Sequence, residues 1–144
     1  GGFVRDLIAG VKNYDLDIVV EGDGIAFAEK FGQQTGWRMV RHKRFRTATL
    51  LTKEHHKVDI ATARSEYYPQ PASLPVVTPG SLDDDVKRRD FTINTMAISL
   101  DAHGFGRLID LYHGKQDLAQ GRVRILHDRS FIDDPTRVLR EILF

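Results

Sequence analysis

The stretch NYDLDIVVEG, residues 13–22, places two carboxylates two positions apart inside an otherwise apolar run. In a β-strand, residues i and i+2 point to the same face, so Asp15 and Asp17 project together. Leu16 and Ile18 then face the core. Two neighbouring carboxylates repel each other unless a cation lies between them, and hard oxygen ligands suit Mg²⁺ or Mn²⁺. The stretch therefore predicts a strand with either a metal site or an acidic face turned to solvent.

The composition is that of an ordinary globular chain of single-domain size, with 144 residues, 41% of them hydrophobic and 28% charged. Its apolar runs are far shorter than the roughly 20 residues of a membrane span, so no membrane partner is expected. The absence of cysteine excludes a disulfide framework and favours a reducing, cytoplasmic location. A net charge of +1 means that any site for a polyanion must come from local clusters of charge.

The patterns on either side of residues 13–22 predict an α+β fold with a small, mostly antiparallel sheet. Apolar residues at helical spacing and a closing glycine predict a surface helix over residues 23–32. The DAHG tetrapeptide at 101–104 has the composition of a hairpin turn. Besides residues 15–20, the expected strands cover 38–40, 47–52, 57–61, 97–100, 107–111 and 122–126, and short helices cover 3–10, 115–119 and the segment after Pro135.

Residues 66–85 show neither helical nor strand periodicity. They contain four prolines, at positions 69, 71, 75 and 79, and an acidic patch at 83–85. We expect one long loop here, and loops of that length are usually functional or disordered.

The Gly1-Gly2 pair lies directly upstream of the two carboxylates. Glycines let backbone N–H groups approach a phosphate, and the N-terminus of the helix that follows favours an anion. Arg5 lies in the first turn of that helix. Nucleotidyl transfer requires held phosphates and a metal, so the turn, the arginine and the carboxylates together predict a triphosphate–Mg²⁺ site. The alternative for the glycine pair is a plain tight turn.

Asp59 is a further candidate for this site. It stands between Val58 and Ile60 in a predicted strand, so its side chain points away from the core face that they define. It is expected to be either a third metal ligand or an ion-pair partner for Arg64.

Four motifs, in order along nearly the whole chain, resemble those of the class II tRNA nucleotidyltransferases, or CCA-adding enzymes, and their bacterial poly(A) polymerase relatives. GGFVRD with DLD resembles the metal and triphosphate motif of that family, and KRRDFTINTMA resembles its ribose motif. IDLYHGKQDL resembles the hinge motif, and DDPTRVLR the base-selecting motif. The resemblance implies a polymerase-β-like nucleotidyltransferase head over residues 1–127 and the start of a helical neck over 128–144.

The resemblance also implies an activity. The family adds CMP or AMP, from CTP or ATP, to the 3′ end of tRNA without a template, with Mg²⁺ or Mn²⁺, and releases pyrophosphate. A poly(A) polymerase acting on another RNA, and an inactive RNA- or nucleotide-binding module, are the alternatives. By resemblance, Asp15 and Asp17 are the catalytic metal ligands. The implied nucleotide-binding residues are Gly1, Gly2, Arg5, Arg88, Arg89, Asp90, Asn94, Asp134, Arg137 and Arg140.

The implied base-reading pair has a physical rationale. Asp134 and Arg137 are three positions apart on an expected helix and so share a face. A carboxylate accepts hydrogen bonds and a guanidinium donates them. Cytosine N4 and adenine N6 are amino donors, whereas guanine and uracil place a carbonyl oxygen at the corresponding edge. The pair is therefore expected to accept C or A and to reject G and U. The alternative is a helix N-cap with a simple salt bridge.

The chain departs from the family pattern at two positions and at its ends. Arg46 stands where relatives typically have glycine, in an F-G-T-A stretch, and this is expected to alter a turn near the active site. Leu143 stands where the final helix commonly has arginine, and this is expected to remove a phosphate contact. The chain opens on Gly1 without a methionine and stops at Phe144 inside a helical pattern, so we expect a fragment of a longer protein.

Overall fold

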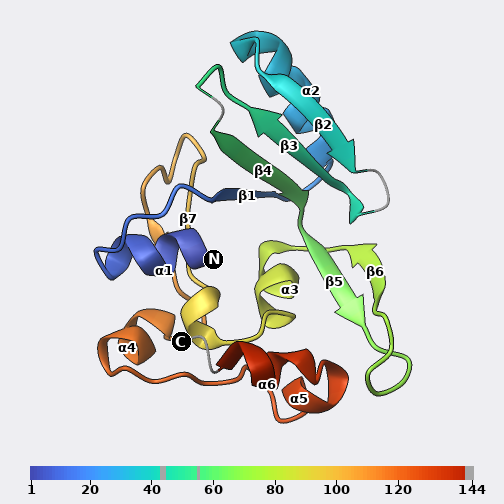
Figure 1. Ribbon diagram of the computed structural model, residues 1–144, viewed down its shortest axis with the longest axis vertical. Helices are drawn as coiled ribbons and strands as arrows, with labels where there is room; N and C mark the ends of the chain where they lie inside the picture. Colours follow the sequence, from blue (N-terminus) through green and yellow to red (C-terminus); the bar gives the residue numbers. More distant parts are fainter. Residues whose placement is uncertain (43–44, 55, 142–144) are drawn as a thin grey trace.

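A four-stranded mixed sheet with the strand order β1-β4-β3-β2 forms one end of the protein (Figure 1). β1 runs parallel to β4, whereas β3 is antiparallel to both β4 and β2. The predicted α+β class and the small, mostly antiparallel sheet are therefore confirmed. The strands are β1 (Leu16–Val20), β2 (Arg38–His42), β3 (Thr47–Leu51) and β4 (Lys57–Thr62). The computed structural model describes residues 1–42, 45–54 and 56–141.

The core lies between this sheet and α2 (Gly24–Thr35), which covers one face. Asp23 caps α2 by accepting a hydrogen bond from the Ala26 N–H group, and Gly36 ends it in the left-handed conformation at φ +71°. The helix is thus longer than predicted, because Gly32 lies buried inside it and Gly36 is the glycine that ends it. Alternate residues of the strands point into this layer, as the sequence pattern predicted. The buried cluster consists of Ala28, Ala48, Leu50, Val58 and Ile60, with Leu16, Ile18, Val20, Phe31, Trp37 and Met39 packed against it.

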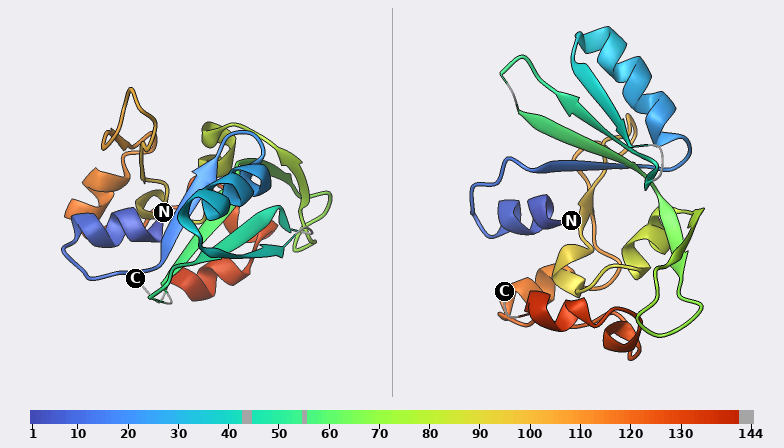
Figure 2. Two further views of the ribbon diagram at one scale, coloured as in Figure 1. Left: turned by 90° about the horizontal axis from the view of Figure 1, so that it is seen from above. Right: turned by 45° about the vertical axis from the view of Figure 1, so that its right-hand side comes forward.

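The remaining helices lie toward the other end of the molecule, away from α2 (Figures 1 and 2). They form a mostly helical layer that also holds a small antiparallel pair of strands, β7 and β8. None of the helices in the described residues is long and apolar enough to cross a membrane. The elements of this layer are α1 (Gly2–Ile8), η2 (Thr92–Asn94), β7 (Ala97–Ile98), β8 (Leu108–Ile109) and α4 (Gly114–Ala119).

The prediction of one long loop over residues 66–85 is wrong. β5 (Arg64–Tyr67) pairs antiparallel with β6 (Val76–Pro79), and α3 (Leu82–Lys87) follows. All four residues of β6 are exposed, so this hairpin has no buried face that would give an alternating apolar pattern. A capping box between Ser81 and Asp84 starts α3, whose only buried apolar residue is Val86.

The C-terminal segment also differs from the prediction in two ways. A strand was expected over 122–126, but the segment makes only one isolated bridge, between Phe91 and Ile125. A short helix that was not predicted, α5 (Ser130–Asp133), precedes α6 (Thr136–Glu141). The division into a head (1–127) and the start of a neck (128–144) stays a prediction. The expected effect of Leu143 lies outside the described residues.

Candidate nucleotide-binding site

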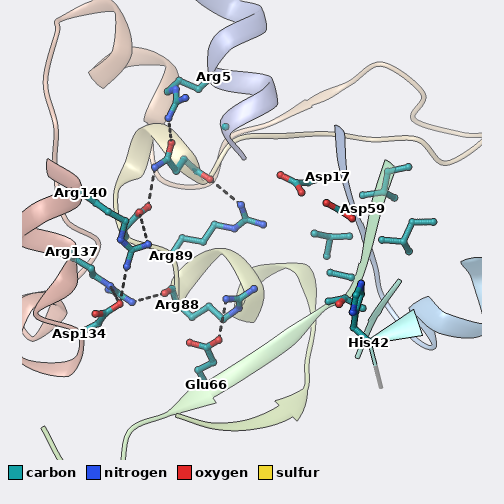
Figure 3. Close-up of a pocket in the computed structure, with 18 of the residues that line it drawn as sticks. Arg5, Asp17, His42, Asp59, Glu66, Arg88, Arg89, Asp134, Arg137 and Arg140 are labelled. Atoms are coloured by element: carbon teal, nitrogen blue, oxygen red, sulfur yellow. Dashed lines mark hydrogen bonds and ion pairs between the residues drawn. The ribbon is translucent and has the colours of Figure 1, made fainter. Parts of the chain in front are cut away.

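A pocket of ≈ 770 Å³ lies between the open face of the sheet and the helical layer (Figure 3). Its sheet wall comes from β1, β2, β3 and β4, and its opposite wall comes from α1, the segment after α3, and α6. Most of the site residues expected from the sequence converge here. The charged residues that line it are Arg5, Asp17, Asp59, Glu66, Arg88, Arg89, Asp90, Asp134, Arg137 and Arg140.

The sheet wall carries a row of polar side chains. Asp17, Asp59 and Thr49 are partners in the register of adjacent strands, so they lie side by side on the face opposite the core. The Thr49 hydroxyl donates to Asp59 Oδ1 at 2.5 Å, and His42 Nε2 lies 3.5 Å from Thr49 Oγ1. Of the two roles considered for Asp59, the pairing with Arg64 is not made, since Arg64 pairs with Glu66 at 2.9 Å.

Asp17 lies in an electrostatically unfavourable position. Partial burial raises the pKa of its carboxyl group, and the negative charges of Asp15 and Asp59 raise it further, whereas Arg89 lowers it. Asp15 precedes β1 and, like Asp17, is exposed, but of the two only Asp17 lines the pocket. The role of Asp15 beside Asp17 stays a prediction, and Asp59 adds a second carboxylate next to Asp17 on the adjacent strand.

The donor set of the sheet wall fits a hard divalent cation. Within the described residues, no three His, Cys, Asp or Glu side chains are arranged to hold a metal by themselves. Mg²⁺, however, usually binds through one or two carboxylates and takes its other ligands from water and substrate phosphates. Asp17 and Asp59 provide that number of carboxylates, and a cation between them would relieve the repulsion that raises the pKa of Asp17.

Two arginines form the centre of the opposite wall. Arg88 donates from Nε and Nη2 to Asp85 Oδ1, at 3.1 and 2.7 Å, and from Nη1 to Glu66 Oε1 at 3.1 Å. Arg89 donates from Nη2 to Asp85 Oδ2 at 2.9 Å and from Nη1 to the Asn94 carbonyl oxygen at 3.3 Å. Both guanidinium groups are therefore fixed while they border the pocket.

A chain of hydrogen bonds links the other candidate residues across this wall (Figure 3). Arg5 donates to Asn94 Oδ1 at 2.8 Å, and the Asn94 amide donates to Asp90 Oδ1 at 3.0 Å. Arg140 donates to Asp90 Oδ2 at 3.2 Å and to Asp134 Oδ2 at 2.8 Å. Residues from α1, η2 and α6 thus form one connected polar network, and phosphate or sugar oxygens could bind to it.

Arg137 and Asp134 share one end of the pocket, but they do not share a helix face as predicted, because Asp134 is an extended residue that precedes α6. The Arg137 side chain is buried, with Nη1 donating to Ser130 Oγ at 2.5 Å and Nη2 donating to the Arg88 carbonyl oxygen at 2.7 Å. Its Nε atom has no hydrogen-bond partner among the described residues and lies 3.8 Å from Asp134 Oδ2. The two terminal nitrogens of Arg137 therefore stabilise the fold, and its Nε–H group remains as a donor beside the Asp134 carboxylate.

Asp134 stays ionised in this arrangement. Burial alone raises the pKa of its carboxyl group, but the hydrogen bonds from Thr136 and the charges of Arg140 and Arg137 outweigh burial and lower it. An ionised carboxylate only accepts hydrogen bonds. The cap and salt bridge considered as an alternative are present as well, because Asp134 Oδ1 accepts from the Thr136 N–H group at 3.0 Å.

The two N-terminal glycines lie at the edge of the same site. The Gly1 carbonyl oxygen accepts from the N–H groups of Val4 and Arg5 at 3.0 and 3.1 Å, which starts α1. A Cβ atom on Gly1 would lie 2.8 Å from Arg89 Nη1, so any larger residue would displace that guanidinium. Gly2 lines the pocket.

The sequence interpretation missed four polar residues of the site: Asp85, Glu66, Tyr68 and Thr49. Asp85 and Arg88 or Arg89 are three and four positions apart in the sequence, which is the spacing of side-chain pairs on a helix. That signal was available, but the segment was assigned to a loop. Glu66 and Tyr68 belong to the hairpin that was also assigned to the loop, and their link to the pocket depends on tertiary contacts.

The chain matches known proteins over most of its length. Residues 1–124 match the family described as Poly A polymerase head domain. The chain is 51% identical over all of its residues to an A-adding tRNA nucleotidyltransferase of Geobacter sulfurreducens, of which it covers 16%. It is 47% identical over its whole length to an A-adding tRNA nucleotidyltransferase of Halalkalibacterium halodurans, of which it covers 34%.

The fold also closely matches that of a solved protein. A structure of a CCA-adding enzyme in an apo form shares 50% sequence identity, with a TM-score of 0.94 over 99% of this chain and 34% of the other. The expected polymerase-β-like head fold is therefore confirmed, and the chain spans about a third or less of the proteins that it matches. From its sequence match and its fold, the chain belongs to the Poly A polymerase head domain family of nucleotidyltransferases.

Proposed function

We propose that this chain is the catalytic head of an RNA nucleotidyltransferase that adds AMP or CMP, from ATP or CTP, to the 3′ end of tRNA. The observation that carries the proposal is the combination of three parts in one pocket: paired carboxylates, fixed arginines and an acceptor–donor pair. The two relatives described above are named A-adding enzymes, which favours AMP as the transferred group. A cytoplasmic location and a poly(A)-adding activity on other RNA stay predictions.

In this proposal Arg88 and Arg89, in the wall opposite the sheet, bind the triphosphate. The carboxylate wall, which is the sheet wall with Asp17 and Asp59, faces the reacting phosphorus. The 3′ oxygen of the RNA forms a bond to the α-phosphorus, and the bond from that phosphorus to the bridging oxygen breaks. Pyrophosphate leaves, held by Arg88 and Arg89, and the hydroxyl proton passes to the carboxylate wall. A divalent ion bound by Asp17 and Asp59 would neutralise phosphate charge and lower the pKa of the attacking hydroxyl.

Asp134 and Arg137 would select the base. Asp134 Oδ2 accepts from the exocyclic amino group of adenine or cytosine, and Arg137 Nε–H donates to the neighbouring ring nitrogen. Guanine and uracil present an oxygen and an N–H group at these two places, so both contacts would become repulsive. In the part of the chain that the structure describes, the buried Arg137 Nε has no hydrogen-bond partner, and this supports the role because a buried donor normally finds an acceptor.

The first test is calorimetric titration of the protein with ATP, CTP, GTP and UTP in the presence of Mg²⁺. We expect GTP and UTP to bind roughly 10- to 100-fold more weakly, since each wrong hydrogen-bond pair costs about 1–3 kcal/mol. Asp134→Asn should reduce this discrimination. Asp133→Asn is the matched control, because Asp133 is adjacent in sequence but pairs with Arg129. Equal binding of all four nucleotides by the wild-type protein would contradict the base-reading assignment.

A transfer assay then tests the reaction itself. The protein is incubated with labelled ATP or CTP and with tRNA that ends before the terminal A, before CCA, or after it. Incorporation of a single AMP into the first of these substrates is the expected result. Asp17→Asn should abolish incorporation while leaving the protein folded. Full activity of this variant would refute a catalytic role for the carboxylate wall.

A further inference from the structure

We propose that Asp85 is a positioning residue that sets the geometry of the two triphosphate-binding arginines from behind the pocket. The proposal rests on the function proposed above. It adds a residue that is neither a ligand of the nucleotide nor part of the pocket wall. It also assigns a role to one residue of the acidic patch at 83–85.

The placement of Asp85 differs from that of the pocket residues. Its side chain is completely buried, and the pocket is lined by Arg88 and Arg89 but not by Asp85. Asp85 lies in α3, one turn before the two arginines, and its backbone N–H donates to the Ser81 carbonyl oxygen at 3.0 Å. The capped helix therefore holds the carboxylate in a fixed position on the protein side of both guanidinium groups.

Each carboxylate oxygen of Asp85 serves a different arginine. Oδ1 accepts two hydrogen bonds from Arg88, and Oδ2 accepts one from Arg89. Burial alone raises the pKa of Asp85, but the charges and hydrogen bonds of both arginines outweigh burial and lower it, so the carboxylate stays ionised. Charge-assisted bonds of this kind are about twice as strong as neutral ones and strongly restrict the donor groups.

The arginines keep donors for a ligand after these bonds are made. A guanidinium has five N–H groups, and Asp85 accepts from only two nitrogen atoms of Arg88 and one of Arg89. Within the described residues, the bonds of Arg88 and Arg89 leave an N–H on each terminal nitrogen of both side chains. This leaves unpaired donors on the two arginines that line the pocket, as a triphosphate requires.

Asp85 also links the proposed phosphate-binding arginines to the end of the pocket where the base would bind. The Arg88 carbonyl oxygen accepts the hydrogen bond from Arg137 Nη2 at 2.7 Å, so the residue that Asp85 restrains in turn supports the proposed base-reading arginine. Glu66, in β5, accepts a hydrogen bond from Arg88 Nη1 and so connects the β5–β6 hairpin to the same group of side chains. A displaced Arg88 would disturb both ends of the site.

The test compares Asp85→Asn and Asp85→Glu with Asp83→Asn, in calorimetric titrations with ATP and with inorganic pyrophosphate in the presence of Mg²⁺. Asp83 is the matched control because it lies in the same helix but pairs with Lys87 at the surface. We expect Asp85→Asn to raise the Kd of both ligands on the order of 10- to 100-fold, since it removes charge-assisted bonds from two arginines. Asp83→Asn should bind as the wild type does. Weaker binding of pyrophosphate identifies the phosphate-binding arginines as the affected groups, and any additional loss for ATP measures the disturbance of Arg137.

Asp85→Glu keeps the charge but moves the carboxylate by one methylene, so it remains informative if Asp85→Asn does not fold. It should also raise both Kd values, with thermal unfolding close to that of the wild type. Folded Asp85 variants that bind both ligands with wild-type affinity would overturn the inference and leave the proposed function intact. A wild-type protein that binds neither ATP nor pyrophosphate would instead refute the proposed function, on which the inference rests.

Discussion

Arg46→Gly should stabilise the protein. Arg46 has a φ of +52°, in the left-handed region that disfavours residues with a Cβ atom. Its carbonyl oxygen accepts a hydrogen bond from the Thr62 N–H group at 3.2 Å, so this backbone conformation is tied to β4 and cannot relax freely. The sequence singled out this position because the resembled family typically has glycine there.

The size of the effect follows from two opposing contributions. The left-handed conformation costs a residue with a Cβ atom about 1–2 kcal/mol, and glycine removes that cost. Glycine also makes the unfolded chain more flexible, which costs about 0.5–1 kcal/mol. The net gain in the free energy of unfolding is therefore roughly 0.5–1 kcal/mol, which corresponds to a Tm increase of about 2–4 °C.

Urea unfolding of the wild type, Arg46→Gly and Arg46→Ala measures this contribution. The alanine variant loses the guanidinium but keeps the Cβ atom, so the difference between the two variants isolates the backbone. Arg46→Gly should unfold at a higher urea concentration than Arg46→Ala, with an unchanged slope of the transition. If the glycine variant is equally stable or less stable, the backbone at this position is not strained, and the reasoning fails.

Two further perturbations test the carboxylate wall and the packing of α4. Asp17→Asn should be more stable than the wild type at pH 7 in the absence of divalent metal, because burial and the charges of Asp15 and Asp59 raise the folded-state pKa above 3.8. The folded wild type then binds more protons than the unfolded chain above that pH, so its stability falls as pH rises, and the advantage of the variant should vanish near pH 3. Urea midpoints that differ equally at both pH values would contradict this. Gly114→Ala should destabilise the protein by about 1–3 kcal/mol or more, because its Cβ atom would lie 2.3 Å from the Thr92 carbonyl oxygen. A urea midpoint equal to that of the wild type would show that this contact relaxes freely.

The sheet was predictable because its strands carry their own pattern. Leu16 and Ile18 alternate with Asp17 in β1, and Val58 and Ile60 flank Asp59 in β4, so each strand indicates which face is buried. The same reasoning failed for residues 66–85. β6 buries nothing and α3 buries a single apolar side chain, so neither element has a periodic signal, although both form through pairing and capping.

The predicted strand over residues 122–126 failed for the opposite reason. Its local composition is suitable, but a strand also requires a neighbour, and only Phe91 offers a bridge, to Ile125. Local propensity without a partner does not produce a ladder, because strand stability comes from cross-strand pairs.

The sequence by itself determined which residues carry charge toward one face of the sheet, and it predicted that Asp134 and Arg137 lie close together, although Asp134 precedes α6 instead of sharing a helix face with Arg137. Both results depend on spacings of two or three residues, because residues so close along the backbone have side chains that lie near each other. Only the tertiary structure decided that Asp59 stands beside Asp17 in the pocket wall. Only it decided that Asp85 is buried behind two arginines. Such pairings join segments far apart in the chain, or depend on burial by distant elements, and no local periodicity encodes them.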